Sequence, residues 1–160
     1  MILGRADGGY LCLSDPLFNR IIFDPATSDW SDIYLRQFLN SQIVYQLSYS
    51  VGVSNLLPID RNLNALSGMR IHGVMQDQVS LFTADEFLMY KDILHRTSEP
   101  FLLCTAWNTL NPGPYIPSVA TVVGEDTFIE CPCNQSFEIR PVCIFSDEVF
   151  RKKVTVSHEY

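Results

Sequence analysis

Two stretches of the chain have apolar residues at the spacing that predicts an amphipathic helix. Between residues 31 and 47 these residues recur at intervals of three and four, as Leu35, Phe38, Leu39, Ile43 and Leu47. Ser28 or Ser31 is expected to cap the start of this helix. The second stretch follows Thr83 and ends near Thr97, with apolar residues Phe87, Leu88, Tyr90, Ile93 and Leu94. Thr83 and Glu86 have the spacing of a capping box, which indicates a helix start at this point.

Shorter runs, rich in β-branched and aromatic residues, predict strands. They cover residues 9–14, 19–23, 78–82 and 101–107, a hairpin over 118–131 that turns at 124–126, and a last strand that ends at Phe145. Residues 50–77 look like an irregular excursion, because glycine and proline interrupt short apolar pairs. Two early helices followed by several antiparallel strands predict an α+β fold with a mostly antiparallel, twisted sheet.

An Arg-Pro pair interrupts the last predicted strand, where proline cannot donate a hydrogen bond to a neighbouring strand. We expect Pro141 to lie at an edge or a bulge, where this loss costs little. Arg140 has five donors and is expected to satisfy backbone carbonyls or a carboxylate beside the break, with Asp32 or Glu86 as candidate carboxylates. Both residues are therefore interpreted as structural.

Composition and charge narrow the choice of partner. The chain has 160 residues, and we expect one domain that spans residues 1–160. Only 18% of the residues are charged, which hints at contact with other protein. The net charge is -7 and the basic residues form no stripe, so nucleic-acid binding is not expected. No run approaches the ~20 apolar residues of a membrane-spanning helix, so no membrane partner is expected.

Residues with catalytic or metal-binding chemistry do not form a recognisable motif. The five cysteines are expected to be reduced, structural thiols. Cys131 and Cys133 are separated by one residue, which is closer than the usual zinc-ligand spacing, and the three histidines are isolated in sequence. No cysteine is placed beside a base by a motif. We therefore predict no catalytic residue, no metal and no cofactor.

The order of motifs resembles that of a known domain family. The motifs are "YLCLSDPLFNRIIFDP", "DWSDIYLRQFLN", "VSLFTADEFLMY", "FLLCTAW", "VATVVGEDTFIE" and "EIRPVCIF". Together they resemble an uncharacterised bacterial and phage family with a C-type-lectin-like fold, related to the formylglycine-generating enzymes and to the variable proteins of diversity-generating retroelements. The resemblance covers residues 10–145 and is weakest over residues 50–77. The sequence departs from the pattern at Trp107, where the family has paired tryptophans, and at Glu138, where it has glycine.

The long loop at residues 108–117 is the first candidate for a binding surface. Three prolines stiffen it, and it contains no Asp or Glu for the calcium-dependent sugar binding known from lectin folds. Its apolar and aromatic residues suit a preorganised contact with a protein partner, and they are Trp107, Leu110, Tyr115 and Ile116. The alternative is that these residues pack under the loop into the core.

The first helix contains two further residues for which a structural role is predicted. Trp30 is expected to staple the start of this helix to the core, the alternative being an exposed anchor for a partner. Arg36 is expected to pair with Asp32 one turn earlier, the alternative being an anion-binding role.

These inferences favour a non-enzymatic, protein-binding or structural module. The resemblance implies a phage virion accessory component, such as a decoration, fibre or tail-associated protein, located in the virion or, before assembly, in the host bacterial cytoplasm. Its partners would be other virion proteins or further copies of the chain. Residues 1–9 and 146–160 would be docking arms. The alternatives are a cytosolic adaptor or inhibitor that binds a host protein through residues 108–117, and an enzyme of the formylglycine-generating type.

Overall fold

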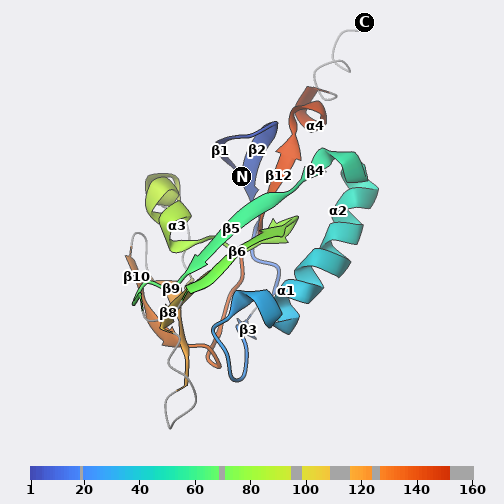
Figure 1. Cartoon of the computed structure of the whole chain (residues 1–160). Helices are drawn as coiled ribbons and strands as arrows, with labels where there is room; N and C mark the ends of the chain where they lie inside the picture. The colour runs from blue at the N-terminus through green and yellow to red at the C-terminus, as the bar shows by residue number, and fades with distance from the viewer. Residues whose placement is uncertain (19, 69–70, 95–98, 109–115, 124–126, 152–160) are drawn as a thin grey trace, which may run out of the picture.

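The last strand in the described part of the chain lies in the middle of the main sheet. A computed structural model describes residues 1–18, 20–68, 71–94, 99–108, 116–123 and 127–151 (Figure 1). In it, β12 (Val142–Ser146) is antiparallel to β2 (Gly9–Leu13) on one side and to β4 (Leu56–Leu57) and β7 (Val79–Ser80) on the other. The terminal strand of the described chain therefore pairs with the N-terminal region.

Strand β1 (Ile2–Ala6) extends this sheet beyond β2. The close approach of β12 to β2 requires a glycine at position 9, because a Cβ atom there would lie 2.0 Å from the carbonyl oxygen of Phe145. The predicted docking arm at residues 1–9 thus contains a strand that pairs within the chain.

The other strands form three smaller antiparallel sheets. The first consists of β10 (Thr127–Pro132), β9 (Ser118–Val123) and β8 (Phe101–Asn108). Strand β8 confirms the strand predicted over residues 101–107, and β9 and β10 confirm both arms of the predicted hairpin. The turn of this hairpin, at 124–126, lies outside the described residues. The second pairs β5 (Ile59–Asn64) with β6 (Ile71–Asp77), and the third pairs β3 (Ile21–Ile22) with β11 (Ser136–Phe137). Helices and mostly antiparallel sheets together confirm the α+β class.

The prediction of an irregular excursion over residues 50–77 is wrong. The segment contains the end of a helix, β4 and the β5–β6 hairpin. Strand β5 alternates strictly between buried and exposed positions, with Ile59, Arg61 and Leu63 buried. An arginine at the middle inward position hides the period-two pattern, because arginine normally marks the solvent side of a strand.

The first helix is longer and less regular than predicted. It consists of a 3-10 turn, η1 (Trp30–Asp32), followed by α1 (Tyr34–Phe38), a π-helical segment, η2 (Leu39–Ile43), and α2 (Val44–Val51). Gly52 ends it with φ 90°, a conformation that favours glycine. The expected cap at Ser28 or Ser31 is wrong, because Asp29 accepts a hydrogen bond from the Ser31 N–H at 3.0 Å.

The second predicted helix is confirmed together with its capping box. It is formed by α3 (Ala84–Tyr90) and a 3-10 turn, η4 (Lys91–Ile93). The Thr83 hydroxyl accepts from the Glu86 N–H at 3.1 Å, and the Glu86 carboxylate accepts from the Thr83 N–H at 3.0 Å. The predicted end near Thr97 falls outside the described residues.

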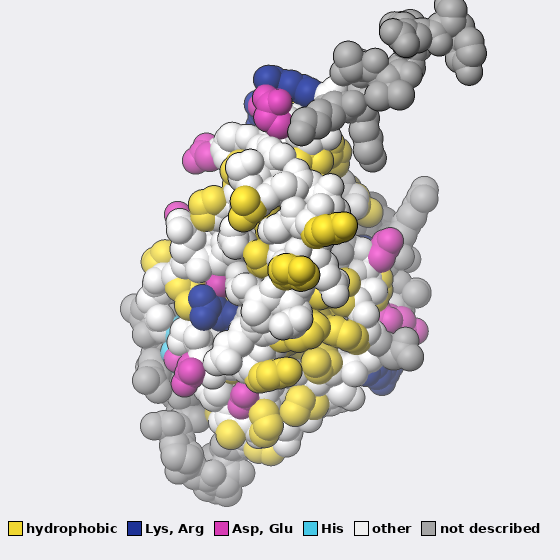
Figure 2. All heavy atoms as spheres, turned by 90° about the vertical axis from the view of Figure 1, so that its right-hand side faces the viewer, with side chains coloured by type: hydrophobic (Ala, Val, Ile, Leu, Met, Phe, Trp, Pro, Cys, Tyr) yellow, Lys and Arg dark blue, Asp and Glu magenta, His cyan; other side chains and the backbone are white. Residues whose placement is uncertain are grey.

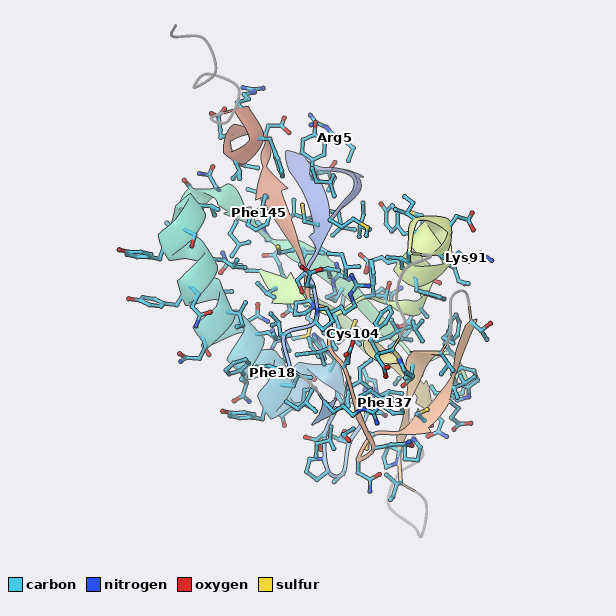
Figure 3. All side chains as sticks on the ribbon, turned by 180° about the vertical axis from the view of Figure 1, so that it is seen from behind. Arg5, Phe18, Lys91, Cys104, Phe137 and Phe145 are labelled. Atoms are coloured by element: carbon cyan, nitrogen blue, oxygen red, sulfur yellow. The ribbon has the colours of Figure 1, made fainter. Side chains whose placement is uncertain are left out.

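The β1–β2 hairpin, with Arg5, lies beside α4 at one end of the molecule (Figure 3). Arg5 donates two hydrogen bonds, at 2.6 and 2.9 Å, to the carboxylate of Asp147 at the start of α4 (Asp147–Arg151). The predicted C-terminal docking arm thus begins as a short helix tied to β1, and residues 152–160 of that arm lie outside the described residues.

The backbone beside the Arg-Pro pair shows how the proline is accommodated. Pro141 immediately precedes β12, a central strand, so the expected edge or bulge position is wrong. The Ser14 N–H donates to the Pro141 carbonyl at 2.8 Å, which places Pro141 opposite Ser14. In an antiparallel pair the opposing N–H would return to the Ser14 carbonyl, and proline has none. The Arg140 guanidinium donates to this carbonyl instead, at 3.3 Å.

Arg140 therefore donates a hydrogen bond to a backbone carbonyl opposite Pro141, which is one of its two expected roles. The prediction that Arg140 pairs with the carboxylate of Asp32 or Glu86 is wrong. Glu86 bonds to Arg61, and the acidic residues whose charges act on Arg140 are Asp15 and Glu138.

The Arg140 guanidinium takes the place of the N–H that Pro141 lacks, and this role can be tested. Replacing Arg140 with methionine leaves the Ser14 carbonyl without its donor and should lower the free energy of unfolding by about 1–3 kcal/mol. In an R140M/P141A double variant the restored N–H at position 141 should recover part of this loss, as measured by urea denaturation. No recovery would show that Arg140 does not replace the missing donor.

Candidate protein-interaction surface

Three tyrosines project into solvent from the helical segment formed by α1, η2 and α2. Tyr34, Tyr45 and Tyr49 are 74%, 73% and 89% exposed. Tyr45 and Tyr49 are four residues apart on one helix, so their side chains lie on the same face. Aromatic side chains with this degree of exposure are typical of protein-binding surfaces, where tyrosine is enriched.

The helical surface around Tyr45 and Tyr49 carries no charge. Residues 37–59 contain no Asp, Glu, Lys or Arg. We define the tyrosine face as the exposed Tyr34 together with the exposed side chains of residues 37–53; its members are Tyr34, Gln37, Ser41, Gln42, Tyr45, Gln46, Tyr49, Ser50 and Val53. Free surfaces of soluble proteins are normally rich in lysine and glutamate, and interface cores are depleted of both. The tyrosine face therefore has the composition of an interface.

Figure 2 looks onto this side of the molecule. Hydrophobic and aromatic side chains gather along the helix, and acidic and basic side chains lie mainly around it. None of the helices in the described part of the chain is long and apolar enough to span a bilayer.

The inner side of the same helix packs against the main sheet. Ile43 and Leu47 are half-buried and contact the core, whereas α2 has no fully buried residue. Between helix and sheet lies an apolar cavity of about 380 Å³ that reaches Cys12 and Cys143. The π-helical segment is held by Asn40, whose amide oxygen accepts from the Gln78 N–H at 2.8 Å and whose amide nitrogen donates to the Val79 carbonyl at 2.8 Å.

Partner binding was predicted for four residues in or beside the loop at 108–117, and two of them, Trp107 and Ile116, lie among the described residues. Trp107 is half-buried, and its ring packs edge-on against Phe128 with the centroids 6.0 Å apart. Ile116 is 47% exposed. Leu110 and Tyr115 lie outside the described residues. Trp107 thus belongs largely to the core side of the loop, and partner binding by this loop stays a prediction.

A buried carboxylate joins the two structural residues of the first helix. Asp77 accepts from Trp30 Nε1 at 2.8 Å and from Arg36 Nε at 2.8 Å. Trp30 is completely buried, as expected for a residue that staples the helix to the core. The expected pairing of Arg36 with Asp32 is wrong, because the partner lies 41 residues later at the end of β6.

A second buried charge is present at Arg61 in β5. Its side chain is 1% exposed, and it donates to the carboxylate of Glu86 and to the carbonyl of Leu81. Its Nε and Nη2 atoms have no hydrogen-bond partner among the described residues. Arg61, Glu86 and Tyr90 line one wall of an open cavity of about 590 Å³ that extends to Arg5. Arg5 and Arg61 are both already paired with carboxylates.

The five cysteines are buried and free. Burial raises the pKa of Cys104 and of Cys143 to about 12, and that of Cys133 to about 11. Cys104 lies in the middle of the molecule (Figure 3). These thiols stay protonated near neutral pH, so they lack the thiolate that nucleophilic or redox chemistry requires.

The described residues contain no group of three His, Cys, Asp or Glu side chains that could hold a metal. The nearest approach to a catalytic arrangement is His72, whose Nδ1 lies 3.3 Å from the Asp29 carboxylate. The His72 ring is almost completely buried. The Ser31 hydroxyl bonds to Asp29 at 2.7 Å, so the carboxylate sits between serine and histidine. A nucleophile needs to be next to the base, and this order does not provide it.

The tyrosine face was missed by reasoning from motifs and periodicity. Periodicity identifies this helix by its buried positions and carries no information about its exposed ones. The signal that could have found it is the run of residues 37–59 without charge, in a chain with 29 charged side chains elsewhere. Such a run on an amphipathic helix indicates that the solvent side is adapted to something other than water.

Comparisons of the chain with protein-family models, with curated proteins and with solved structures find no match. No related structure therefore establishes the C-type-lectin-like arrangement that the motifs suggest, and that arrangement stays a prediction.

Proposed function

We propose that the chain is a non-enzymatic, protein-binding or structural module that works through the tyrosine face. The observation that carries this proposal is the exposure of Tyr45 and Tyr49 on a helical surface without charge, with a third exposed tyrosine, Tyr34, at the start of the same helical segment. Tyrosine supplies a large contact area at a small cost in side-chain entropy, and an uncharged rim is cheap to desolvate. The motif resemblance favours a phage virion accessory component as the setting.

The electrostatics of the chain support protein over nucleic acid as the partner. The net charge is -7, and phosphate groups require a basic surface. Two arginines, Arg36 and Arg61, are already paired with carboxylates, Arg36 with the buried Asp77 and Arg61 with Glu86. The remaining exposed surface thus offers an acidic background with one neutral, aromatic face.

The other two interpretations have less support. A formylglycine-generating type of enzyme needs a reactive cysteine pair, whereas burial raises the pKa of Cys104 and Cys143 to about 12. An adaptor that binds a host protein through residues 108–117 would use Trp107, whose ring packs on Phe128.

The proposal is tested by the mass of the protein in its source lysate. The chain has a mass of 18.2 kDa, and sedimentation should show it in a larger assembly. A Tyr45→Ser/Tyr49→Ser variant should shift it towards the 18.2 kDa position, whereas Tyr10→Ser, on β2, should not. A variant that stays in the same assembly would show that the tyrosine face is not the binding surface.

A further inference from the structure

We infer that the tyrosine face binds a second copy of the chain in a two-fold symmetric dimer. This inference rests on the proposed function, because it names the partner of the same surface. Three properties of the face support a second copy: its neutrality, its self-complementary chemistry and its length.

The neutrality of the face selects where two acidic molecules can meet. Two copies with a net charge of -7 each repel one another when most of their surfaces approach. The tyrosine face removes this repulsion locally, because residues 37–59 carry no charge. A basic partner would instead be attracted to the acidic surface outside this face.

The chemistry of the face is complementary to itself. A two-fold axis places the same residues of both copies opposite one another. Carboxylates or ammonium groups in that position would repel, and a surface with donors only could not pair with its copy. The exposed polar side chains of α2 are the amide of Gln46 and the hydroxyls of Tyr45, Tyr49 and Ser50. Each of these groups both donates and accepts hydrogen bonds, so each can pair with its symmetry mate.

The length of the helical segment suits pairing with a second helix. Residues 34–51 form one continuous helical segment, which is about 27 Å long at 1.5 Å per residue. Two such segments crossing in an antiparallel pair pack with their axes about 8–10 Å apart. We place the centre of the interhelical contact on α2, between Tyr45 and Tyr49, because these two exposed tyrosines lie on one face of this helix.

A charge-swap experiment tests the dimer without relying on a destabilised protein. Gln46 is exposed in the middle of α2, and glutamate and lysine have similar helix propensities at such a position. Gln46→Glu and Gln46→Lys each place like charges near the two-fold axis and should weaken the dimer by about tenfold or more. An equimolar mixture of the two variants should recover dimerisation as a heterodimer. Analytical ultracentrifugation over a range of concentrations measures all three, with Gln135→Glu as an exposed control that should not alter the dimer.

The outcomes separate this inference from the proposed function. A purified protein that remains at 18.2 kDa at every concentration would overturn the inference, as would Gln46 variants that dimerise normally. If such a monomer still enters a larger assembly in the lysate, and the Tyr45→Ser/Tyr49→Ser variant does not, the proposed function stands with a different partner. If that assembly is also unaffected by the variant, both are wrong.

Discussion

Replacing Asp77 with alanine is expected to lower the free energy of unfolding by about 3–5 kcal/mol. The Asp77 side chain is fully buried and accepts hydrogen bonds from Trp30 and Arg36. Its removal leaves the buried indole N–H without an acceptor and takes the carboxylate partner from Arg36, which keeps its hydrogen bond to the Ser31 carbonyl. Urea denaturation, followed by tryptophan fluorescence, measures the effect.

Two further variants identify the origin of the loss of stability in Asp77→Ala. Asp77→Asn keeps an oxygen acceptor but removes the charge, so it should lower the free energy of unfolding by less than Asp77→Ala does. Asp60→Ala is the matched control, because Asp60 lies on the adjacent strand β5 with an exposed side chain that accepts from Gln76. A loss for Asp60→Ala as large as that for Asp77→Ala would mean that strand pairing, and not the buried acceptor, carries the energy.

The second large effect is expected at Glu86. Its carboxylate accepts from the buried Arg61 and from the Thr83 N–H at the start of α3. Glu86→Ala leaves the Arg61 charge buried without a carboxylate partner and should cost about 3–5 kcal/mol. Arg61→Met removes the buried charge itself and fills most of its volume, so it should cost less, although both variants break the same ion pair.

The informative result is which of the two variants, Glu86→Ala or Arg61→Met, loses more free energy of unfolding. Asp85→Ala, which removes an exposed carboxylate from the same helical turn, is the control and should cost no more than about 1 kcal/mol. If Arg61→Met costs more than Glu86→Ala, the arginine contributes packing or unseen contacts that outweigh the burial of its charge.

Elements with a regular apolar pattern could be predicted from the sequence. The capping box at Thr83 and Glu86 identified the start of α3, and the continuous apolar run at residues 101–107 identified β8. The α+β class followed from the order of such elements. The C-type-lectin-like arrangement and the phage setting rest on the motif resemblance.

Elements stabilised by distant polar partners could not be predicted. Strand β5 was missed because its inward Arg61 depends on Glu86, 25 residues later. The role of Arg36 was assigned to the neighbouring Asp32 because Asp77 becomes a neighbour only after folding. Long-range partners of this kind leave no periodic signal, so the sequence reveals the charged residue but not its contact.

The central position of β12 also has a consequence for the order in which the molecule can fold. Its contacts with β2 join residues about 130 positions apart, such as Cys12 and Cys143, so the main sheet has a high contact order. During synthesis, β2, β4 and β7 are made before β12 and lack their shared neighbour until residues 142–146 leave the ribosome. The nascent chain therefore presents unpaired strand edges until β12 has been made, and this is the stage at which aggregation competes with folding.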